Sequence, residues 1–167
     1  MSETPGRGMH HLGLATHDME ATLDFYENVL GFAARVCEMI EPETGGASRH
    51  AFLDAGQGEL IAFMECNEVR GVAGDFDTSI NRGLGIRGGL IHFAFAVLDE
   101  VELEKKRNEL LEKGVEVTEV VDHRWCKSIY FKDPNCLQLE FCCLTAELGE
   151  EHVRGRMSEA WTRWARR

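Results

Sequence analysis

Two short segments of the chain have the same pattern of hydrophobic and polar positions. Residues 11–18 read HLGLATHD, and residues 92–99 read HFAFAVLD. Each begins with a histidine, continues as a strand-like run, and reaches an aspartate seven positions after the histidine. Alternation with a period of two is typical of a β-strand, and an aspartate directly after it is a common helix N-cap. The pattern therefore predicts a strand followed by a helix at both places.

The two predicted helices have matching start and stop signals. Asp18 and Asp99 precede them, and Gly31 and Gly114 end them, because glycine readily adopts the conformation that terminates a helix. In the second helix, Glu102 stands three positions after the aspartate, which is a capping-box arrangement. The apolar pattern runs through Leu23, Tyr26, Val29 and Leu30 in the first helix and through Leu103, Leu110 and Leu111 in the second.

The similarity continues beyond the helices. Residues 52–63, FLDAGQGELIAF, parallel residues 130–141, YFKDPNCLQLEF, with one extra residue in the first turn. Each copy therefore reads as a strand, a helix and several short strands, and two copies indicate a duplication within one domain rather than a solenoid. We expect a domain at 8–145, built of module one at 8–66, a connecting loop at 67–89 and module two at 90–145. A helical tail follows at 146–167, with Met157, Trp161 and Trp164 on one stripe.

Strand parity selects one histidine of the adjacent pair His10 and His11. Side chains alternate between the two faces of a strand, so His11 and His92 share their faces only with glycine and alanine. This leaves open space beside each imidazole, whereas a structural histidine is usually packed by its neighbours. His10 has the opposite parity. The bulky residues that should pack on the helices are Leu12, Leu14, Phe93, Phe95 and Val97.

The same parity argument singles out a carboxylate in the last strand of module two. Glu140 alternates with the apolar residues of 137–141, so it lies on the face opposite to the packed one. Either this face is simply exposed to water, or the carboxylate has a function. His11, His92 and Glu140 together have the composition of the triad that holds a divalent metal with open positions. The module-one equivalent of Glu140 is Ala62, so a fourth protein ligand is missing.

Composition excludes several classes of function. The 167 residues are the size of one domain, and the net charge of −11 argues against nucleic acid or an anionic membrane as partner. No apolar run is long enough to span a membrane, and the N-terminus lacks the features of a signal peptide, so we expect a cytoplasmic protein. The six cysteines form no C-x-x-C pair, which argues against a zinc ribbon or a secreted disulfide framework.

The residues HHLGLATHDMEATLDFYENVLGF (10–32), IHFAFAVLD (91–99) and IYFKDPNCLQLEF (129–141) resemble three motifs of the vicinal oxygen chelate superfamily, in the same order and separation. This superfamily includes glyoxalases, bleomycin- and fosfomycin-resistance proteins and extradiol dioxygenases. The resemblance implies an α+β fold of two βαβββ modules whose strands curl into a mixed-sheet cup around one metal. It also implies a homodimer, with the cup formed within one chain or across two.

Among these proteins, extradiol dioxygenases use two histidines and one glutamate, which map onto His11, His92 and Glu140. The resemblance therefore implies a ring-cleaving enzyme with Fe(II) at these residues and a small-molecule substrate with vicinal oxygens. Tyr130 lies ten residues before the glutamate, as in that class, and would hydrogen-bond an oxygen that is bound to the metal. His123 is the candidate acid or base, and His50 is a less favoured alternative that could reach the cup.

Two other functions remain open. A glyoxalase-like lyase or isomerase, or a fosfomycin-type transferase, would use the same three ligands with Mn(II), Ni(II), Co(II) or Zn(II), and His123 or Glu65 would move the proton. A metal-free binding protein of the bleomycin-resistance type would have no need of the three ligands. One departure from the superfamily pattern is Cys136, which stands where a glycine usually follows Asp-Pro-Asn and is expected to adopt a positive φ.

Overall fold

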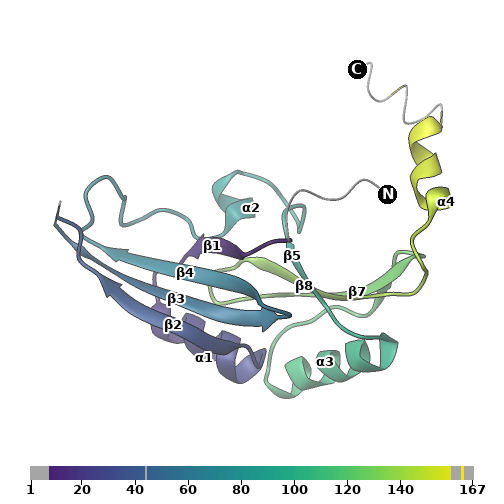
Figure 1. Cartoon of the computed structure of the whole chain (residues 1–167), viewed down its shortest axis with the longest axis horizontal. Helices are drawn as coiled ribbons and strands as arrows, with labels where there is room; N and C mark the ends of the chain where they lie inside the picture. Colours follow the sequence, from purple (N-terminus) through teal and green to yellow (C-terminus); the bar gives the residue numbers. More distant parts are fainter. Residues whose placement is uncertain (1–7, 44, 159–162, 164–167) are drawn as a thin grey trace.

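The structure is a computed structural model that describes residues 8–43, 45–158 and 163. Its first half is one four-stranded mixed sheet in the order β1-β4-β3-β2, with β1 parallel to β4 and the other pairs antiparallel. Figure 1 shows helix α1 lying along one side of this sheet. The elements are β1 (His11–Ala15), α1 (Met19–Asp24), a π-helical turn (Phe25–Val29), β2 (Ala33–Ile40), β3 (Ala47–Gly56) and β4 (Glu59–Asn67).

The second half repeats this arrangement. Its sheet has the order β5-β8-β7-β6, again with one parallel pair, β5 with β8, and α3 lies along one side (Figure 1). The predicted duplication and α+β fold are therefore confirmed. The elements are α2 (Ile80–Gly83) in the connection, then β5 (Phe93–Ala96), α3 (Glu100–Glu112), β6 (Val121–Asp122), β7 (Cys126–Lys132) and β8 (Gln138–Leu144).

Both helices begin at the predicted caps. The Asp18 carboxylate accepts a hydrogen bond from the Ala21 amide, and the Asp99 carboxylate accepts one from the Glu102 amide, each at 2.9 Å. These contacts satisfy amides that the first helical turn leaves unpaired. The glycines at 31 and 114 end the helical segments at φ values of 82° and 77°. Between cap and glycine, the first helix differs from the prediction because its second part is a π-helical turn.

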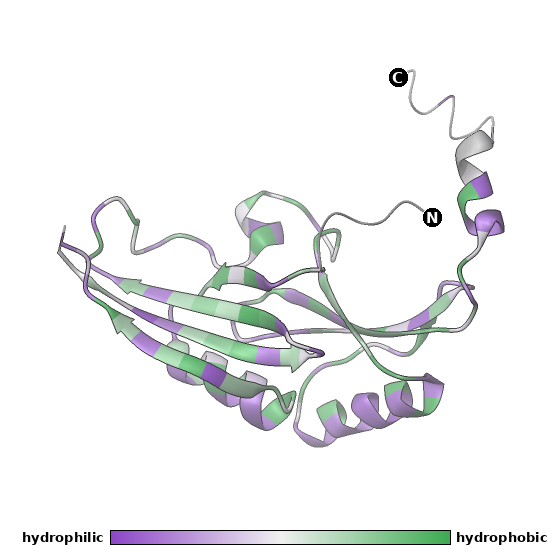
Figure 2. Cartoon of the chain, viewed as in Figure 1, coloured by the Kyte–Doolittle hydropathy of each residue, from purple (hydrophilic) through white to green (hydrophobic). Residues whose placement is uncertain are grey.

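One hydrophobic core joins the two halves. It contains α1 and α3 residues together with the alternate strand residues that face them, among them Leu53, Phe63, Leu139 and Phe141. Figure 2 shows hydrophobic residues recurring along β3 and β4 and interrupting the otherwise hydrophilic α3. The face of each sheet that packs on this core is called the core face below, and the opposite face is called the outer face.

The halves contact one another through side chains on the core side. The Phe32 and Phe95 rings lie 5.0 Å apart, edge to face. The hydroxyl of the buried Tyr26 donates to the Asp133 carboxylate at 3.2 Å, although the two residues lie 107 positions apart. Lys113, at the end of α3, donates to main-chain carbonyls at the end of the π-helical turn. The outer faces take no part in these contacts.

The alternation of faces agrees with the parity argument. Phe93, Phe95 and Leu14 pack against the core. Gly13 and Ala94 lie on the outer faces and are exposed, and a Cβ added at Gly13 would meet nothing within 4 Å. Among the described residues, no hydrogen-bonded strand pair joins the two sheets, so the chain offers two open half-cups.

Three further features can be compared with the sequence expectations. Cys136 has the positive φ expected of it, 57°, and Gly58 holds the corresponding turn of the first half at 83°. In the expected helical tail, α4 covers only Glu150–Val153 and a 3₁₀ turn follows at Arg154–Met157; Trp161 and Trp164 lie outside the described residues. No helix among the described residues is long and apolar enough to cross a membrane.

Candidate metal centre

The candidate site begins with a histidine and a carboxylate on the outer face of the second sheet. The Nε2 atom of His92 lies 3.0 Å from Oε2 of Glu140. Glu140 is 5% exposed, so the structure rejects the alternative that this carboxylate simply faces water. A buried carboxylate that lies against an imidazole must have a proton or a cation beside it, because an unpaired charge would be costly to bury.

The second nitrogen of His92 is held by the main chain. Its Nδ1 atom lies 2.9 Å from the carbonyl oxygen of Gly89. A carbonyl only accepts, so Nδ1 carries the hydrogen and Nε2 is the nitrogen presented to Glu140 and to any metal. Histidine ligands of metals are usually oriented in this way, by a carbonyl or carboxylate on the other nitrogen. Every residue type has a main-chain carbonyl, so the sequence did not indicate that Gly89 would make this contact.

The connecting loop fixes the start of this strand. The Asn81 side chain, in α2, donates to the carbonyl of Ile91 at 2.6 Å and accepts from the Ile91 amide at 3.0 Å. Gly89 passes close to Gln138, and a Cβ at this position would lie 2.9 Å from that side chain. The loop at 67–89 therefore has a structural role beside the candidate site, which the sequence left open.

Tyr130 and His123 lie beside the same pair. Tyr130 is the register partner of Glu140, and its ring centroid lies 5.9 Å from that of His92. Nε2 of His123 lies 2.9 Å from the Tyr130 hydroxyl. Burial raises the pKa of the Tyr130 phenol, and the Glu140 carboxylate raises it further. The phenol therefore keeps its proton at neutral pH and can act as a hydrogen-bond donor.

His11 lies on the outer face of the other sheet. It is exposed, its Nδ1 lies 2.8 Å from Nδ1 of His10, and its ring packs 5.5 Å from the Phe52 ring. Within residues 8–43 and 45–158, no three His, Cys, Asp or Glu side chains are placed to hold one metal ion. The chain thus brings His92, Glu140, Tyr130 and His123 together and leaves His11 on a separate half-cup.

The first sheet has its own imidazole–carboxylate pair on the outer face. Nδ1 of His50 lies 3.2 Å from Oε1 of Glu38, and the two residues are register partners in β3 and β2. The sequence pointed to His50 as a less favoured candidate and missed Glu38. The pairing could not be read from the sequence, because a bulge between Ala34 and Val36 shifts the register of the hairpin.

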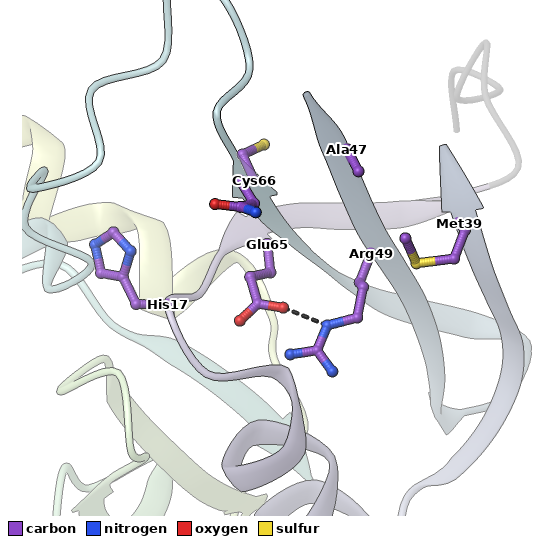
Figure 3. A pocket seen from close by; sticks show the side chains of 7 residues that line it. His17, Met39, Ala47, Arg49, Glu65 and Cys66 are labelled. Carbon is purple, nitrogen blue, oxygen red and sulfur yellow. Dashed lines mark hydrogen bonds and ion pairs between the residues drawn. The ribbon is translucent and has the colours of Figure 1, made fainter. Parts of the chain in front are cut away.

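Glu65 occupies a different environment from the one needed for proton transfer at the candidate site. It lies on the core side of β4, where it lines a polar hollow of about 410 Å³ with His17, Arg49 and Cys66 (Figure 3). The Arg49 guanidinium binds Glu65 and also reaches Glu20 at 2.7 Å. The negative charge of Glu65 is therefore neutralised by the ion pair with Arg49. Glu65 is therefore an ion-pair partner on the face opposite to His11.

Residues 8–141 match the Glyoxalase/Bleomycin resistance protein/Dioxygenase superfamily. The chain belongs to this superfamily. The match covers the first sheet and the second sheet as far as the middle of β8, and it includes His11, His92 and Glu140. The superfamily assignment made from the three sequence motifs is thereby confirmed.

Individual proteins similar to this chain share about a quarter of its residues. An iron-dependent extradiol dioxygenase from Rhodococcus jostii (strain RHA1) is 24% identical over 164 residues, which is 96% of this chain. The chain spans about half (51%) of the length of that relative. The crystal structure of SMU.1112c is 27% identical, with a TM-score of 0.60, and the alignment covers 81% of this chain and 98% of that one.

The fold is also shared with a fosfomycin resistance protein. The structure of a mutant of FosX from Listeria monocytogenes complexed with Mn(II) has a TM-score of 0.58 and 20% identity, covering 88% of this chain and 98% of that one. Superfamily members that bind iron and manganese therefore exist among proteins of this fold. These likenesses agree with a divalent metal and do not identify which one.

Proposed function

We propose that this protein is a metal-dependent enzyme of the extradiol dioxygenase type, which acts on a small molecule with two adjacent oxygens. The observation that carries the proposal is the pair of His92 and Glu140, 3.0 Å apart on an outer face, with the histidine oriented by the Gly89 carbonyl. The relationship to an iron-dependent extradiol dioxygenase supports the reaction type.

The donor set fits Fe(II). Two imidazole nitrogens and one carboxylate form the facial set used by non-haem Fe(II) oxygenases, which leaves coordination positions for substrate and oxygen. Mn(II), Ni(II), Co(II) and Zn(II) also bind such ligands, and geometry and availability decide between them. The buried Ala62 at the position equivalent to Glu140 adds no fourth ligand in the first half. When bound, the metal would supply a place where two substrate oxygens and dioxygen are held next to each other.

We propose that a second copy of the chain supplies His11. The halves of one chain contact one another on their core sides, so, within the described residues, neither outer face packs against the other half. A two-fold dimer that sets the first sheet of one copy against the second sheet of the other forms two identical cups. The exposed apolar residues on the outer faces would be covered in such a dimer. They are Val36 and Ile40 on the first sheet and Val121 and Leu144 on the second.

The residues of the second half have separate roles in this proposal. Tyr130, which keeps its proton, donates a hydrogen bond to a substrate oxygen. His123 exchanges a proton with the Tyr130 hydroxyl, to which it is hydrogen-bonded at 2.9 Å. His123 is exposed, so its proton can pass to solvent. Together they form a path for a proton between the substrate and water.

Subunit complementation tests the shared site without any substrate. His11→Ala and His92→Ala chains are each titrated with Zn(II), and then refolded together and titrated again. Each variant alone should lose tight stoichiometric binding. In the mixture, about one quarter of the sites should regain it, because half of the dimers are mixed and each mixed dimer has one intact cup. Failure to regain any site while the dimer forms would contradict the shared cup.

The reaction type needs a separate test. Protein loaded with Fe(II) under argon is given catechol and air, and oxygen uptake and a yellow ring-fission product are followed. Both should appear with wild-type protein. Turnover of methylglyoxal with a thiol, without oxygen uptake, would instead assign the same metal site to a lyase. Wild-type protein that binds no divalent metal at all would favour a metal-free binding protein.

A further inference from the structure

A fully buried hydroxyl lies on the outer face of the second sheet, beside the candidate metal centre. Ser128 shares its face of β7 with Tyr130, because Ile129, which stands between them, packs in the core. The register partner of Ser128 in β8 is Cys142, two positions after Glu140. The Ser128 side chain is 0% exposed. Its hydroxyl is therefore a near neighbour of the paired residues Tyr130 and Glu140.

This hydroxyl is unusual because it lacks a hydrogen-bond partner. Within the part of the chain that the structure describes, the Oγ atom of Ser128 is the buried side-chain oxygen or nitrogen that has none. A hydroxyl buried without a partner destabilises a fold, whereas an alanine at the same place carries no such cost. An unsatisfied group of this kind in a native fold points to a role in function rather than in stability.

The Tyr130 phenol is a group that such a hydroxyl can serve. The phenol has one hydrogen, and the proposed function requires it for a substrate oxygen. The contact between Nε2 of His123 and the phenol oxygen, at 2.9 Å, can run in either direction, because either nitrogen of a neutral imidazole can carry the hydrogen. A second donor to the phenol oxygen would make the phenol a stronger donor, since hydrogen bonds in a chain polarise one another.

The Ser128 hydroxyl acts on the phenol in the direction expected of a donor. Burial raises the pKa of Tyr130, the Ser128 hydroxyl lowers it, and the Glu140 carboxylate raises it. A donor to the phenol oxygen favours the ionised form, which explains the lowering. Cys126 flanks Ser128 on the other side; burial raises the pKa of this thiol and the Ser128 hydroxyl lowers it. Sulfur is the weaker acceptor of the two, which favours the phenol as the partner.

We propose that Ser128 is a positioning residue of the candidate site, whose hydroxyl donates to the Tyr130 oxygen while the phenol donates to an oxygen of the bound diol. Hydrogen bonds at a catalytic site are often long without substrate and shorten when it binds. Ser128 gains its partner at that point, and its own proton is not transferred. This role rests on the function proposed above, since it requires that Tyr130 contacts the substrate.

A double-mutant cycle tests whether Ser128 acts through Tyr130. Full-length protein loaded with Fe(II) is given catechol and air, and kcat and KM are measured by oxygen uptake. Ser128→Ala should lower kcat by about tenfold and change KM by less than about twofold, as expected for one hydrogen bond made in the transition state. In a Tyr130→Phe background, Ser128→Ala should lower kcat by less than about twofold, because the phenol oxygen is already gone.

Cys126→Ala is the matched control, and unfolding of the metal-free protein is the second measurement. Cys126 is buried on the same face of the same strand, and its loss should leave kcat within about twofold of the wild-type value. Because the Ser128 hydroxyl has no partner in the fold, Ser128→Ala should unfold at the same urea concentration as wild-type protein or at a higher one.

Each other outcome overturns the proposal. An equal loss of kcat in both backgrounds would show that Ser128 does not act through Tyr130. The same loss in Cys126→Ala would mean that the hydroxyl serves the thiol, and a lower urea midpoint for Ser128→Ala would mean that it has a structural partner such as a buried water. These three results leave the proposed function intact. Wild-type protein that binds Fe(II) but does not turn over catechol would overturn the proposed reaction, and the role of Ser128 with it.

Discussion

The two sheets of this protein have the same strand order and the same register, but their outer faces carry different chemistry. In the second sheet, the residue paired with Ala94 is Glu140, which lies against His92. In the first sheet, the residue paired with Gly13 is Ala62, and the side chain within hydrogen-bonding distance of His11 among the described residues is that of His10 rather than a carboxylate. The duplication therefore preserved the backbone and the histidine that begins each half, and only His92 has a carboxylate at the equivalent paired position, because the imidazole–carboxylate pair of the first half is formed by His50 and Glu38 instead.

The difference shows how a repeated fold can divide one site between two halves. The second half supplies two of the three proposed ligands, His92 and Glu140, whereas the first half supplies one, His11. Tight binding then requires both halves to face each other. Because the core holds the two halves of one chain together by their core faces, we propose that the facing half comes from another copy.

The largest change in stability is expected when a carboxylate is placed at position 62, the first-half equivalent of Glu140. Ala62 is 1% exposed, so Ala62→Glu would force a longer side chain and a charge into a packed position beside Gly13 and Phe52, where the nearest equivalent of His92 is the exposed His11. We expect a loss of about 3 kcal/mol in the free energy of unfolding, measured by urea denaturation. Ala33→Glu, at an exposed position of the same sheet, is the control. It should change the free energy of unfolding by less than about 0.5 kcal/mol. Equal stabilities would mean that the first half tolerates a carboxylate there.

Removing the carboxylate of the second half should abolish tight metal binding. Glu140→Ala takes away one of three proposed ligands, and we expect the dissociation constant for Zn(II) to rise by at least about 100-fold. Isothermal titration measures this directly. Glu65→Ala removes a carboxylate from the core side of the first sheet and should change the constant by less than about threefold. A similar loss in both variants would show that the effect is not specific to the site.

The two tyrosines of the chain should respond differently to loss of their hydroxyls. Tyr26 is fully buried and donates to Asp133 between the halves, so Tyr26→Phe should lower the free energy of unfolding by about 1–2 kcal/mol. Tyr130→Phe should lower it by less than about 0.5 kcal/mol but reduce catechol turnover. Thermal denaturation and oxygen uptake of the same samples separate the two roles. Loss of turnover in Tyr26→Phe and loss of stability in Tyr130→Phe would instead mean that the phenol needed for activity is Tyr26, in the core.

The smallest effect concerns the charge of Asp133. Burial raises the pKa of this carboxyl above 3.8, although the Leu137 amide and the Asn135 and Tyr26 side chains lower it. The folded chain therefore binds this proton more readily than the unfolded chain does. The stability that this group contributes is fully present below pH 3.8 and is lost as the pH rises through the folded pKa. Asp133→Asn should thus be more destabilising at pH 4 than at pH 7 by less than about 1 kcal/mol, measured by urea titration at both pH values.

Much of the fold could be predicted from local patterns. Aspartates at 18 and 99 and glycines at 31 and 114 gave both helix boundaries, because caps and positive-φ positions depend on a few neighbouring residues. Parity on the strands placed Phe95 on the core face and Glu140 on the other. The duplication and the superfamily followed from three motifs in order.

What the sequence determined by itself was therefore the repeat and the two faces of each sheet, and from these it predicted which side chains would hold a metal. Only the tertiary structure decided that Glu140 is buried against His92, that the Gly89 carbonyl orients this imidazole, and that Glu38 pairs with His50 across a bulged hairpin. It also decided that the halves of one chain meet on their core sides, which leaves His11 apart. These features depend on contacts between distant segments, and the local alternation of residues contains no information about which segments meet.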